Sequence, residues 1–327
     1  MKPFSFQRAS TVQEAVRLAS AEGARYYAGG TNLLDLMKHG VAEPATVVDV
    51  RRIGTQEITA TDDGGVLIGG AATNSAVANH YFIRSRYPVL SQAILSGATT
   101  QLRNMATAGG NLMQRTRCPY YMEPSFAACN KRRPGSGCAA LEGFNREHAI
   151  FGASDSCVAV HPSDMAVALS ILDALVHVES ASDGRSIPYA HFHRLPDNEP
   201  QRDNSTRPGE LITGIELSPY RHYTHSWYLK IRDRHSYAFA LVSVAVGLTL
   251  AEGEIRTAAI ALGGVAAMPW RVPEAEAALV GTRGDMADLR TAAELALEGA
   301  VPLSQNRFKI DLSKQAVVRS LQRALAR

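Results

Sequence analysis

The stretch RYYAGGTNLLDLMKHG, Arg25 to Gly40, carries the clearest structural pattern in this chain. Its first residues have the aromatic character of a short strand, and the glycine pair marks a tight turn. The apolar residues that follow recur at helical spacing up to Gly40, a residue type that commonly ends a helix. The next apolar run, ATVVDV (residues 45–50), has the pattern of a second strand. The sequence therefore predicts a βαβ-like unit with a glycine turn between its first strand and its helix.

A second and similar turn, TAGGNLM (Thr107–Met113), lies about eighty residues further along the chain. In both turns, backbone N–H groups unhindered by side chains stand beside Thr hydroxyl and Asn amide donors. Such a combination suits an anion such as a pyrophosphate. Neither turn has the G-x-G-x-x-G spacing of a nicotinamide Rossmann fold or the G-K-[ST] of a P-loop. For either glycine pair taken alone, a tight turn without a ligand is an equally open interpretation.

The remainder of the chain alternates helices and strands. Helices are expected from residue 12 to 19, near 76–82, 89–95 and 100–105, and at 164–174, where Ser163 can act as the cap. Strands are expected at 66–71, 175–180, 210–217, 226–233, 239–251 and 257–265, and helices near 274–280 and 285–298 complete the pattern. Residues 182–209, rich in Pro, Asp, Asn, Arg and His, are interpreted as a surface connection. This order predicts an α+β protein with a separate C-terminal α+β domain.

Composition excludes several classes of protein. A chain of 327 residues with 46% hydrophobic and 20% charged residues is typical of a soluble protein of two or three domains. The net charge of +3 is not gathered into a long basic tract, so nucleic acid is not an expected partner. The N-terminal residues lack the apolar core of a signal peptide, and no segment is apolar enough for a membrane span. We therefore expect neither an export signal nor a membrane span in this chain.

All the cysteines lie in one short segment, at Cys118, Cys129, Cys138 and Cys157, with the spacing C-x10-C-x8-C-x18-C. Zinc sites usually contain pairs of cysteines two to four residues apart, and this segment has none. Disulfides are rarely needed by a chain of this size without a secretory signal. Thiolates that arrive from separate directions suit a [4Fe–4S] cluster, whose corners lie apart. Spacing alone leaves the cluster, zinc, disulfides and unligated core cysteines open.

Several motifs in order resemble the FAD-binding subunit of the molybdenum hydroxylases, a family that includes xanthine dehydrogenase, carbon monoxide dehydrogenase and aldehyde oxidoreductases. The motifs are YAGGTNLLDLMK, QLRNMATAGGNL, HPSDMAVALSILDA, GELITGIEL, YLKIRDRHSYAFALVSVAV and ALGGVAAMPWR. They extend over essentially the whole chain in the family's order. In most members the GGN turn is followed closely by the P-x-S-D element, whereas here Asn111 and Ser163 are about fifty residues apart. The cysteines therefore belong to one insertion, which strongly favours a jointly held [4Fe–4S] cluster.

The resemblance implies a set of FAD contacts. The first loop contributes Ala28, Gly29, Gly30, Thr31, Asn32 and Leu33, the second Thr107, Gly110 and Asn111, and further contacts come from Ser163, Asp164, Ile212 and Lys230. Ser163 and Asp164 would approach the ribityl and phosphate region, although a helix cap explains Ser163 as well. Ile212 would pack against the isoalloxazine ring, and the charge of Lys230 would favour its reduced anionic form. No residue set indicates a substrate site of this chain's own, so no catalytic residue is assigned.

The insertion is most similar to that of bacterial periplasmic aldehyde oxidoreductases within the family. The resemblance implies a 1:1:1 heterotrimer with a large subunit that carries the molybdenum cofactor and a small subunit that carries two [2Fe–2S] clusters. Substrate would be oxidised on the large subunit, and electrons would pass from the [2Fe–2S] clusters through FAD to an external acceptor. The chain would reach the periplasm with a partner that bears the signal, or would remain cytoplasmic.

The implied fold is the two-subdomain FAD-binding fold of the vanillyl-alcohol-oxidase type, followed by a C-terminal α+β domain with a small antiparallel sheet. The FAD-binding domain would span residues 1–220, with subdomains at about 1–55 and 56–220 and the cysteine insertion at about 115–160, and the C-terminal domain 221–327. Three other functions stay open. The chain could be the FAD subunit of a xanthine, N-heterocycle or hydroxybenzoyl-coenzyme A enzyme of the same family, a free-standing flavin oxidase, or a metal-stabilised scaffold protein.

Overall fold

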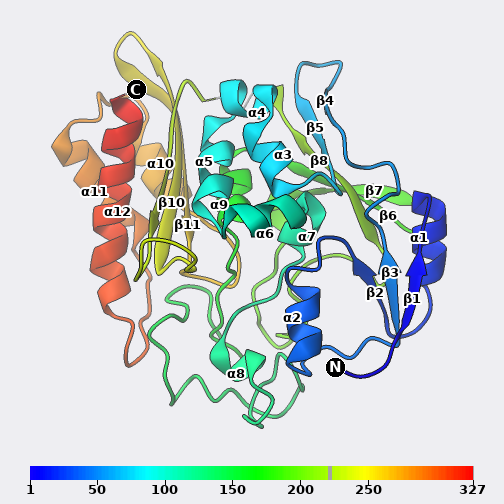
Figure 1. Cartoon of the computed structure of the whole chain (residues 1–327). Coiled ribbons are helices and arrows are strands. Elements are labelled where there is room, and N and C mark those ends of the chain that lie inside the picture. The colour runs from blue at the N-terminus through cyan, green and yellow to red at the C-terminus, as the bar shows by residue number, and fades with distance from the viewer. Residues whose placement is uncertain (220–222, 327) are drawn as a thin grey trace.

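The computed structural model describes residues 1–219 and 223–326, which form three β-sheets with helices packed around them (Figure 1). The domain boundary expected at residues 220 and 221 lies outside the described residues. Within the described part of the chain, no helix is long and apolar enough to cross a membrane.

The first sheet contains the predicted βαβ unit. Its strands are β1 (Ser5–Arg8), β2 (Ala24–Tyr27) and β3 (Thr46–Asp49), all parallel in the order β1-β3-β2. Helix α1 (Val12–Ala19) starts after Thr11, whose hydroxyl accepts the N–H of Glu14, and helix α2 (Leu33–Lys38) connects β2 to β3. The glycine turn that ends β2 is thereby fixed at the edge of this sheet.

The second sheet is antiparallel and has the order β4-β5-β8-β6-β7. Its strands are β4 (Ile58–Ala60), β5 (Val66–Gly69), β6 (Leu175–Glu179), β7 (Gly184–Pro188) and β8 (Leu211–Leu217). The helices that accompany it are α3 (Asn74–Asn79), α4 (Tyr81–Arg86), α5 (Pro88–Ser96), α6 (Thr100–Met105), α7 (Ala108–Leu112) and α9 (Asp164–Ile171). The helix expected near 76–82 is two helices, because the chain turns to an extended conformation at His80.

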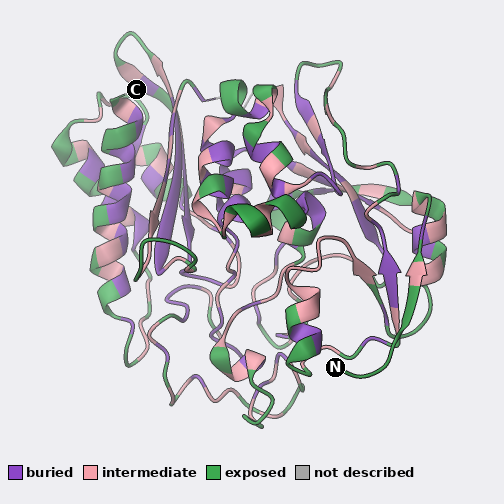
Figure 2. Ribbon diagram, in the orientation of Figure 1, coloured by how far each residue is buried: buried purple, intermediate pink, exposed green. Residues whose placement is uncertain are grey.

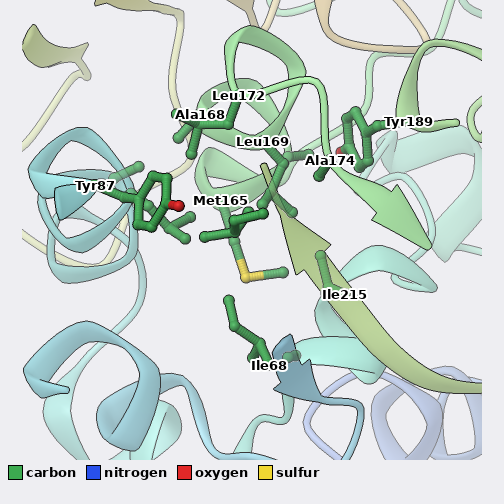
Figure 3. Close-up of a cluster of buried hydrophobic side chains, with 14 of the residues drawn as sticks. Ile68, Tyr87, Met165, Ala168, Leu169, Leu172, Ala174, Tyr189 and Ile215 are labelled. Atoms are coloured by element: carbon green, nitrogen blue, oxygen red, sulfur yellow. The ribbon is translucent and has the colours of Figure 1, made fainter. Parts of the chain in front are cut away.

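Helix α9 is the centre of the main hydrophobic core. Almost all its residues are buried, and Ser163 caps it by accepting the N–H of Ala166, as the sequence predicts. Figure 3 shows Met165 and Leu169 of this helix among side chains from the second sheet and the neighbouring helices. The burial of so many apolar side chains on one short helix fixes the chain directly after the cysteine insertion.

The third sheet lies between two layers of helices. It consists of β9 (His225–Ile231), β10 (Val242–Ala251), β11 (Glu254–Gly263) and β12 (Trp270–Arg271), in the antiparallel order β12-β11-β10-β9. Helices α5 and α9 pack on one face, and α10 (Pro273–Leu279) and α12 (Phe308–Leu325) pack on the other, with α11 (Met286–Ala296) against both of the latter. β10 is accordingly buried from Val242 to Leu248 (Figure 2).

Helix α12, at 18 residues, was not expected from the sequence. Its buried face contains Lys309, Ser313 and Ser320 beside small apolar residues, so the usual apolar stripe of a core-facing helix is interrupted. Residues 182–209 also differ from the expected surface connection. They form strand β7 and the short 3₁₀ helix η1 (Tyr189–His191), and they place Phe192 and His193 in the interior.

The cysteine insertion contains little regular structure apart from α8 (Pro119–Met122), and it lies along the lower edge of the molecule in Figure 1. Buried polar side chains hold it in place. Lys309 of α12 is fully buried, and its Nζ donates to the carbonyl oxygens of Glu147 (2.9 Å), His148 (2.9 Å) and Gly264 (2.7 Å). Asn306 donates to the carbonyls of His148 and Ala149. The C-terminal helix therefore clamps the end of the insertion.

Burial lowers the pKa of Lys309 to about 7. The three carbonyl acceptors oppose that change, because only the ammonium form has three N–H donors to satisfy them all.

Replacing Lys309 with Met should lower the free energy of unfolding by about 3 kcal/mol, since buried carbonyls lose their donor while the side-chain volume is kept. Urea unfolding of the purified protein measures the change. Lys314→Met is the matched control on the same helix, because Lys314 pairs with the mostly exposed Glu294 and its loss should cost under about 1 kcal/mol. Equal losses in the two variants would show that the clamp does not stabilise the fold.

Candidate functional site

A large cavity of about 450 Å³ is lined by both glycine turns. Residues 28–33 of the first turn contribute to it, as do Thr107, Gly109 and Gly110 of the second and Ile212 of β8. Ile212 is 7% exposed and lies next to Gly109, where an added Cβ would come within 3.4 Å of the Ile212 Cβ. The structure thus brings together the two turns and the apolar residue that the sequence assigned to one ligand.

The first turn presents unused hydrogen-bond donors. Within the described part of the chain, the backbone N–H groups of residues 29–33 make no hydrogen bond. The Oδ1 of Asn32 accepts the N–H of Arg115 at 2.9 Å, and its Nδ2 is buried without a partner. Thr55, which also lines the cavity, has a buried hydroxyl without a partner. Buried donors of this kind are costly unless a ligand satisfies them, so this wall fits an anionic polar group.

The second turn differs from the expected anion nest, because the protein itself uses its N–H groups. The residues from Ala108 to Asn111 donate in order to the Ala72 carbonyl, the Gly70 carbonyl, the Thr107 hydroxyl and the Thr107 carbonyl. These residues are the short helix α7, with Thr107 as its cap. The second turn therefore has no free N–H donors for a ligand among these residues, and it borders the cavity with backbone that carries little side chain.

The glycines of the turns have different roles. A Cβ on Gly29 would meet the carbonyl oxygen of Met105 at 1.9 Å, so Gly29 allows the first turn to pack against the chain that leads into the second. Gly30 has φ +70, a conformation that favours glycine. A Cβ on Gly110 would meet the Thr107 hydroxyl at 2.9 Å.

Ser163 and Asp164 line a separate narrow cleft, together with residues 116–119, His148 and His161. The Ser163 hydroxyl donates to the Oδ1 of Asn111, which connects this cleft to the second turn.

Lys230 lines neither cavity. Its side chain is 3% exposed, and its Nζ lies 2.8 Å from Asp164 Oδ2, while Tyr228 donates to Asp164 Oδ1 at 2.7 Å. The charge that the sequence assigned to a flavin is thus paired with a carboxylate.

The four cysteines line one further, small cavity. Cys129 and Cys157 are buried, and all four thiols are unpaired. Burial, with a smaller contribution from the nearby Cys157 and Cys129, raises the pKa of Cys118 to about 12. Burial also raises the pKa of Cys157, to which Cys138 and Cys129 add. The insertion therefore gathers its cysteines at one place, where a positive ion or cluster would stabilise the thiolates.

The cysteines do not have the arrangement of a site for a single metal ion. Among the described residues, no group of three or more His, Cys, Asp or Glu side chains has such an arrangement. The donor set is nonetheless one of sulfur atoms around a common cavity, the chemistry that iron–sulfur clusters use.

The large cavity and the cysteine cavity share a wall. Tyr121, 2% exposed, lines both, and Arg115 lies over its ring with Cζ 4.9 Å from the centroid. Arg115 Nε is 2.6 Å from Asp203 Oδ2, and Lys131 Nζ is 2.5 Å from Asp203 Oδ1. Arg115 lines the large cavity and Lys131 the cysteine cavity, so one carboxylate links the two.

Sequence reasoning did not find Asp203, Lys131, Tyr121 or His148. Asp203 lies in the segment interpreted as a surface connection, and no local pattern indicates that its carboxylate reaches residues 72 and 88 positions away. Arg115 had one available signal, because it stands three residues before Cys118 at the start of the insertion.

Asp203→Asn should lower the free energy of unfolding by about 3 kcal/mol at neutral pH, because two largely buried cations lose their shared counter-charge. Burial alone would raise the pKa of Asp203, but Arg115 and Lys131 outweigh it and lower the pKa. The contribution of the Asp203 carboxylate to the free energy of unfolding is therefore complete above the pKa of about 3.9 that an aspartate has in the unfolded chain. It is lost as the pH falls below that value and through the lower pKa of the folded state. Chemical denaturation at several pH values measures the free energy of unfolding of Asp203→Asn and of wild type, and the difference between the two should become smaller in acid. Asp183→Asn, at an exposed carboxylate beside Arg207, is the control and should cost under about 1 kcal/mol. A free energy of unfolding equal to that of wild type in Asp203→Asn would contradict the assignment of Asp203.

Comparison with known proteins assigns both parts of the chain. Residues 2–219 match the family described as the FAD binding domain in molybdopterin dehydrogenase, and residues 227–327 match the CO dehydrogenase flavoprotein C-terminal domain. The chain is 46% identical to the aldehyde oxidoreductase FAD-binding subunit PaoB of Escherichia coli (strain K12), across 100% of this chain and 99% of that one.

More distant relatives have the same fold. The carbon monoxide dehydrogenase medium chain of Afipia carboxidovorans is 26% identical over 99% of this chain and 97% of its own length. A chain of the reconstituted CO dehydrogenase from Oligotropha carboxidovorans superposes with a TM-score of 0.78 at 25% identity, covering 100% of this chain and 99% of that one. The expected fold class is confirmed, and the chain belongs to the FAD-binding medium subunits of the molybdenum hydroxylases, an oxidoreductase family.

Proposed function

We propose that this chain is the FAD- and [4Fe–4S]-containing electron-transfer subunit of a heterotrimeric, molybdenum-dependent aldehyde oxidoreductase. One observation supports it above the others. A cavity with unsatisfied buried donors adjoins a cavity lined by all four cysteines, with Tyr121 in the wall between them. The identity to an aldehyde oxidoreductase subunit over the full chain supports the aldehyde class of substrate.

FAD would be held in the large cavity. The free N–H groups of residues 29–33 and the Nδ2 of Asn32 would bind its pyrophosphate, since they are the unused donors of this wall. Thr107, Gly110 and Ile212 would border the ligand through close backbone and apolar contacts. Ser163 and Asp164 would reach it from the narrow cleft, and Asn111 would be held beside it by the hydrogen bond from Ser163. Lys230 would act at a distance through its pair with Asp164. When bound, FAD would supply two-electron redox chemistry.

The four cysteines would bind the [4Fe–4S] cluster, which would supply one-electron redox chemistry. Cys118, Cys129, Cys138 and Cys157 are the complete set of thiols, and they border a single cavity. Lys131 is beside them and favours the thiolate form of Cys157, because it lowers the pKa of that thiol against the larger effect of burial.

The partners would be a large subunit with the molybdenum cofactor and a small subunit with two [2Fe–2S] clusters, in a 1:1:1 complex. Several relatives are named as the medium chain or FAD-binding subunit of such enzymes. Substrate oxidation would take place on the large subunit, since the residues of this chain's cavities offer cofactor contacts and no base or nucleophile is assigned. We also propose export to the periplasm together with a signal-bearing partner.

Asn32→Asp tests the assignment of the first turn. The variant keeps the oxygen that accepts the Arg115 N–H but replaces the unpaired Nδ2 donor with an anionic oxygen. FAD affinity should fall about 10- to 100-fold, the value of one hydrogen bond to a charged group. Fluorescence titration of the deflavinated complex measures it, and acid precipitation should release the flavin because it is bound without a covalent bond.

Stopped-flow absorbance of the same complex tests the function. Reduction of the partner's centres by an aromatic aldehyde should stay at the wild-type rate, while reduction of the external acceptor should fall with the lost FAD. Asn79→Asp, an exposed asparagine of α3 that does not line the cavity, is the control for the added charge. Unchanged FAD affinity would refute the placement of the pyrophosphate. Loss of the reduction of the partner's centres by the aldehyde would show that substrate oxidation had been assigned to the wrong subunit.

A further inference from the structure

His148 lies against the sulfur of one of the four cysteines. Its Nε2 is 3.1 Å from Cys118 Sγ, and the residue is 3% exposed. Its other ring nitrogen, Nδ1, is buried without a hydrogen-bond partner among the described residues. Of the cysteine sulfurs in the described chain, that of Cys118 alone has a side-chain hydrogen bond.

The direction of this hydrogen bond follows from the chemistry of the ligand. A cysteine that binds iron is a thiolate, which has no proton and can only accept a hydrogen bond. The proton must then be on Nε2 of His148, because a neutral imidazole has a single N–H. Nδ1 is left with a lone pair, and among the described residues it has no acceptor to which a proton there could be donated.

The backbone around His148 is fixed, so the ring cannot easily leave the sulfur. The N–H of His148 donates to the Asn145 carbonyl at 3.1 Å, and its carbonyl accepts from Asn306 and Lys309. Asn145, Asn306 and Lys309 are each fully buried. The clamp from helix α12 therefore also positions the imidazole.

We infer that His148 donates a hydrogen bond to the Cys118 thiolate and thereby raises the reduction potential of the [4Fe–4S] cluster, acting as a positioning residue. The inference rests on the cluster of the proposed function. Reduction adds negative charge that is shared with the cysteine sulfurs, so an N–H directed at one sulfur stabilises the reduced state more than the oxidised state. The Cys118 sulfur is also on the side that adjoins the narrow cleft of Ser163 and Asp164, because Cys118 lines both cavities.

The test is a redox titration of the intact complex, followed by the electron paramagnetic resonance of the reduced [4Fe–4S] cluster. In His148→Leu the ratio of reduced to oxidised cluster, at the wild-type midpoint, should fall about tenfold, which corresponds to about 59 mV for one electron. His148→Gln, whose amide can donate, should restore part of the shift. His193→Leu removes another buried imidazole that does not line the cysteine cavity, and its midpoint should match that of wild type.

A second measurement covers the case in which His148→Leu does not retain its cluster. In wild-type complex labelled with ¹⁵N-histidine, pulsed electron paramagnetic resonance of the reduced cluster should detect one weakly coupled ¹⁵N nucleus, and His148→Gln should remove it. An unshifted midpoint in a cluster-containing His148→Leu, an equal shift in His193→Leu, or no ¹⁵N coupling in wild type would overturn the inference. A wild-type protein without a [4Fe–4S] cluster would instead refute the proposed function itself.

Discussion

A single carboxylate holds the two candidate cofactor sites together. Asp203 pairs with Arg115 on the side of the large cavity and with Lys131 on the side of the cysteine cavity. The group as a whole has one positive charge in excess, and Lys131 has a side chain only 5% exposed. Such a group is costly to bury unless each partner is satisfied, and a buried ion pair is by itself weak evidence for stability, so a second role would explain it. Its place between a pyrophosphate and four thiolates would supply that reason, because both are anionic.

This arrangement also explains how an insertion with so little regular structure can hold a defined shape. Buried backbone groups need partners, and a segment without helices or strands must obtain them from side chains. Here Asn145 donates to the carbonyls of residues 140 and 141, and Arg132 donates to those of residues 120 and 121. Lys309 of the C-terminal helix, and Asn306 just before that helix, close the end of the segment. The third sheet and its helices are thus part of the cysteine site's support.

Regular elements were predictable where local pattern and burial agree. The strand, turn and helix from Arg25 to Gly40 and the helix capped by Ser163 follow from spacing and caps that act over a few residues. Helix α12 could not be predicted in this way, because its buried face is made of Lys309, serines and small residues whose partners lie far away in the chain.

The candidate site was predictable to a similar extent. Motifs placed both glycine turns and Ile212 at one cavity, and the cysteine count indicated a joint site. The role of each turn was not predictable, since two N–H groups of the second turn donate to the carbonyls of Ala72 and Gly70, which only the folded chain brings near. Asp203 and His148 act through contacts across 30 or more residues, for which the sequence offers no local signal.

The central claim is that the four cysteines, gathered beside the FAD cavity, hold a [4Fe–4S] cluster. Anomalous scattering at the iron absorption edge, from crystals of the intact complex, tests it most directly. The account predicts a compact group of four iron atoms in the cavity bordered by Cys118, Cys129, Cys138 and Cys157, separate from the iron of the partner subunit. A signal at the zinc edge in that cavity, or cysteine sulfurs joined as disulfides with no iron among them, would contradict it.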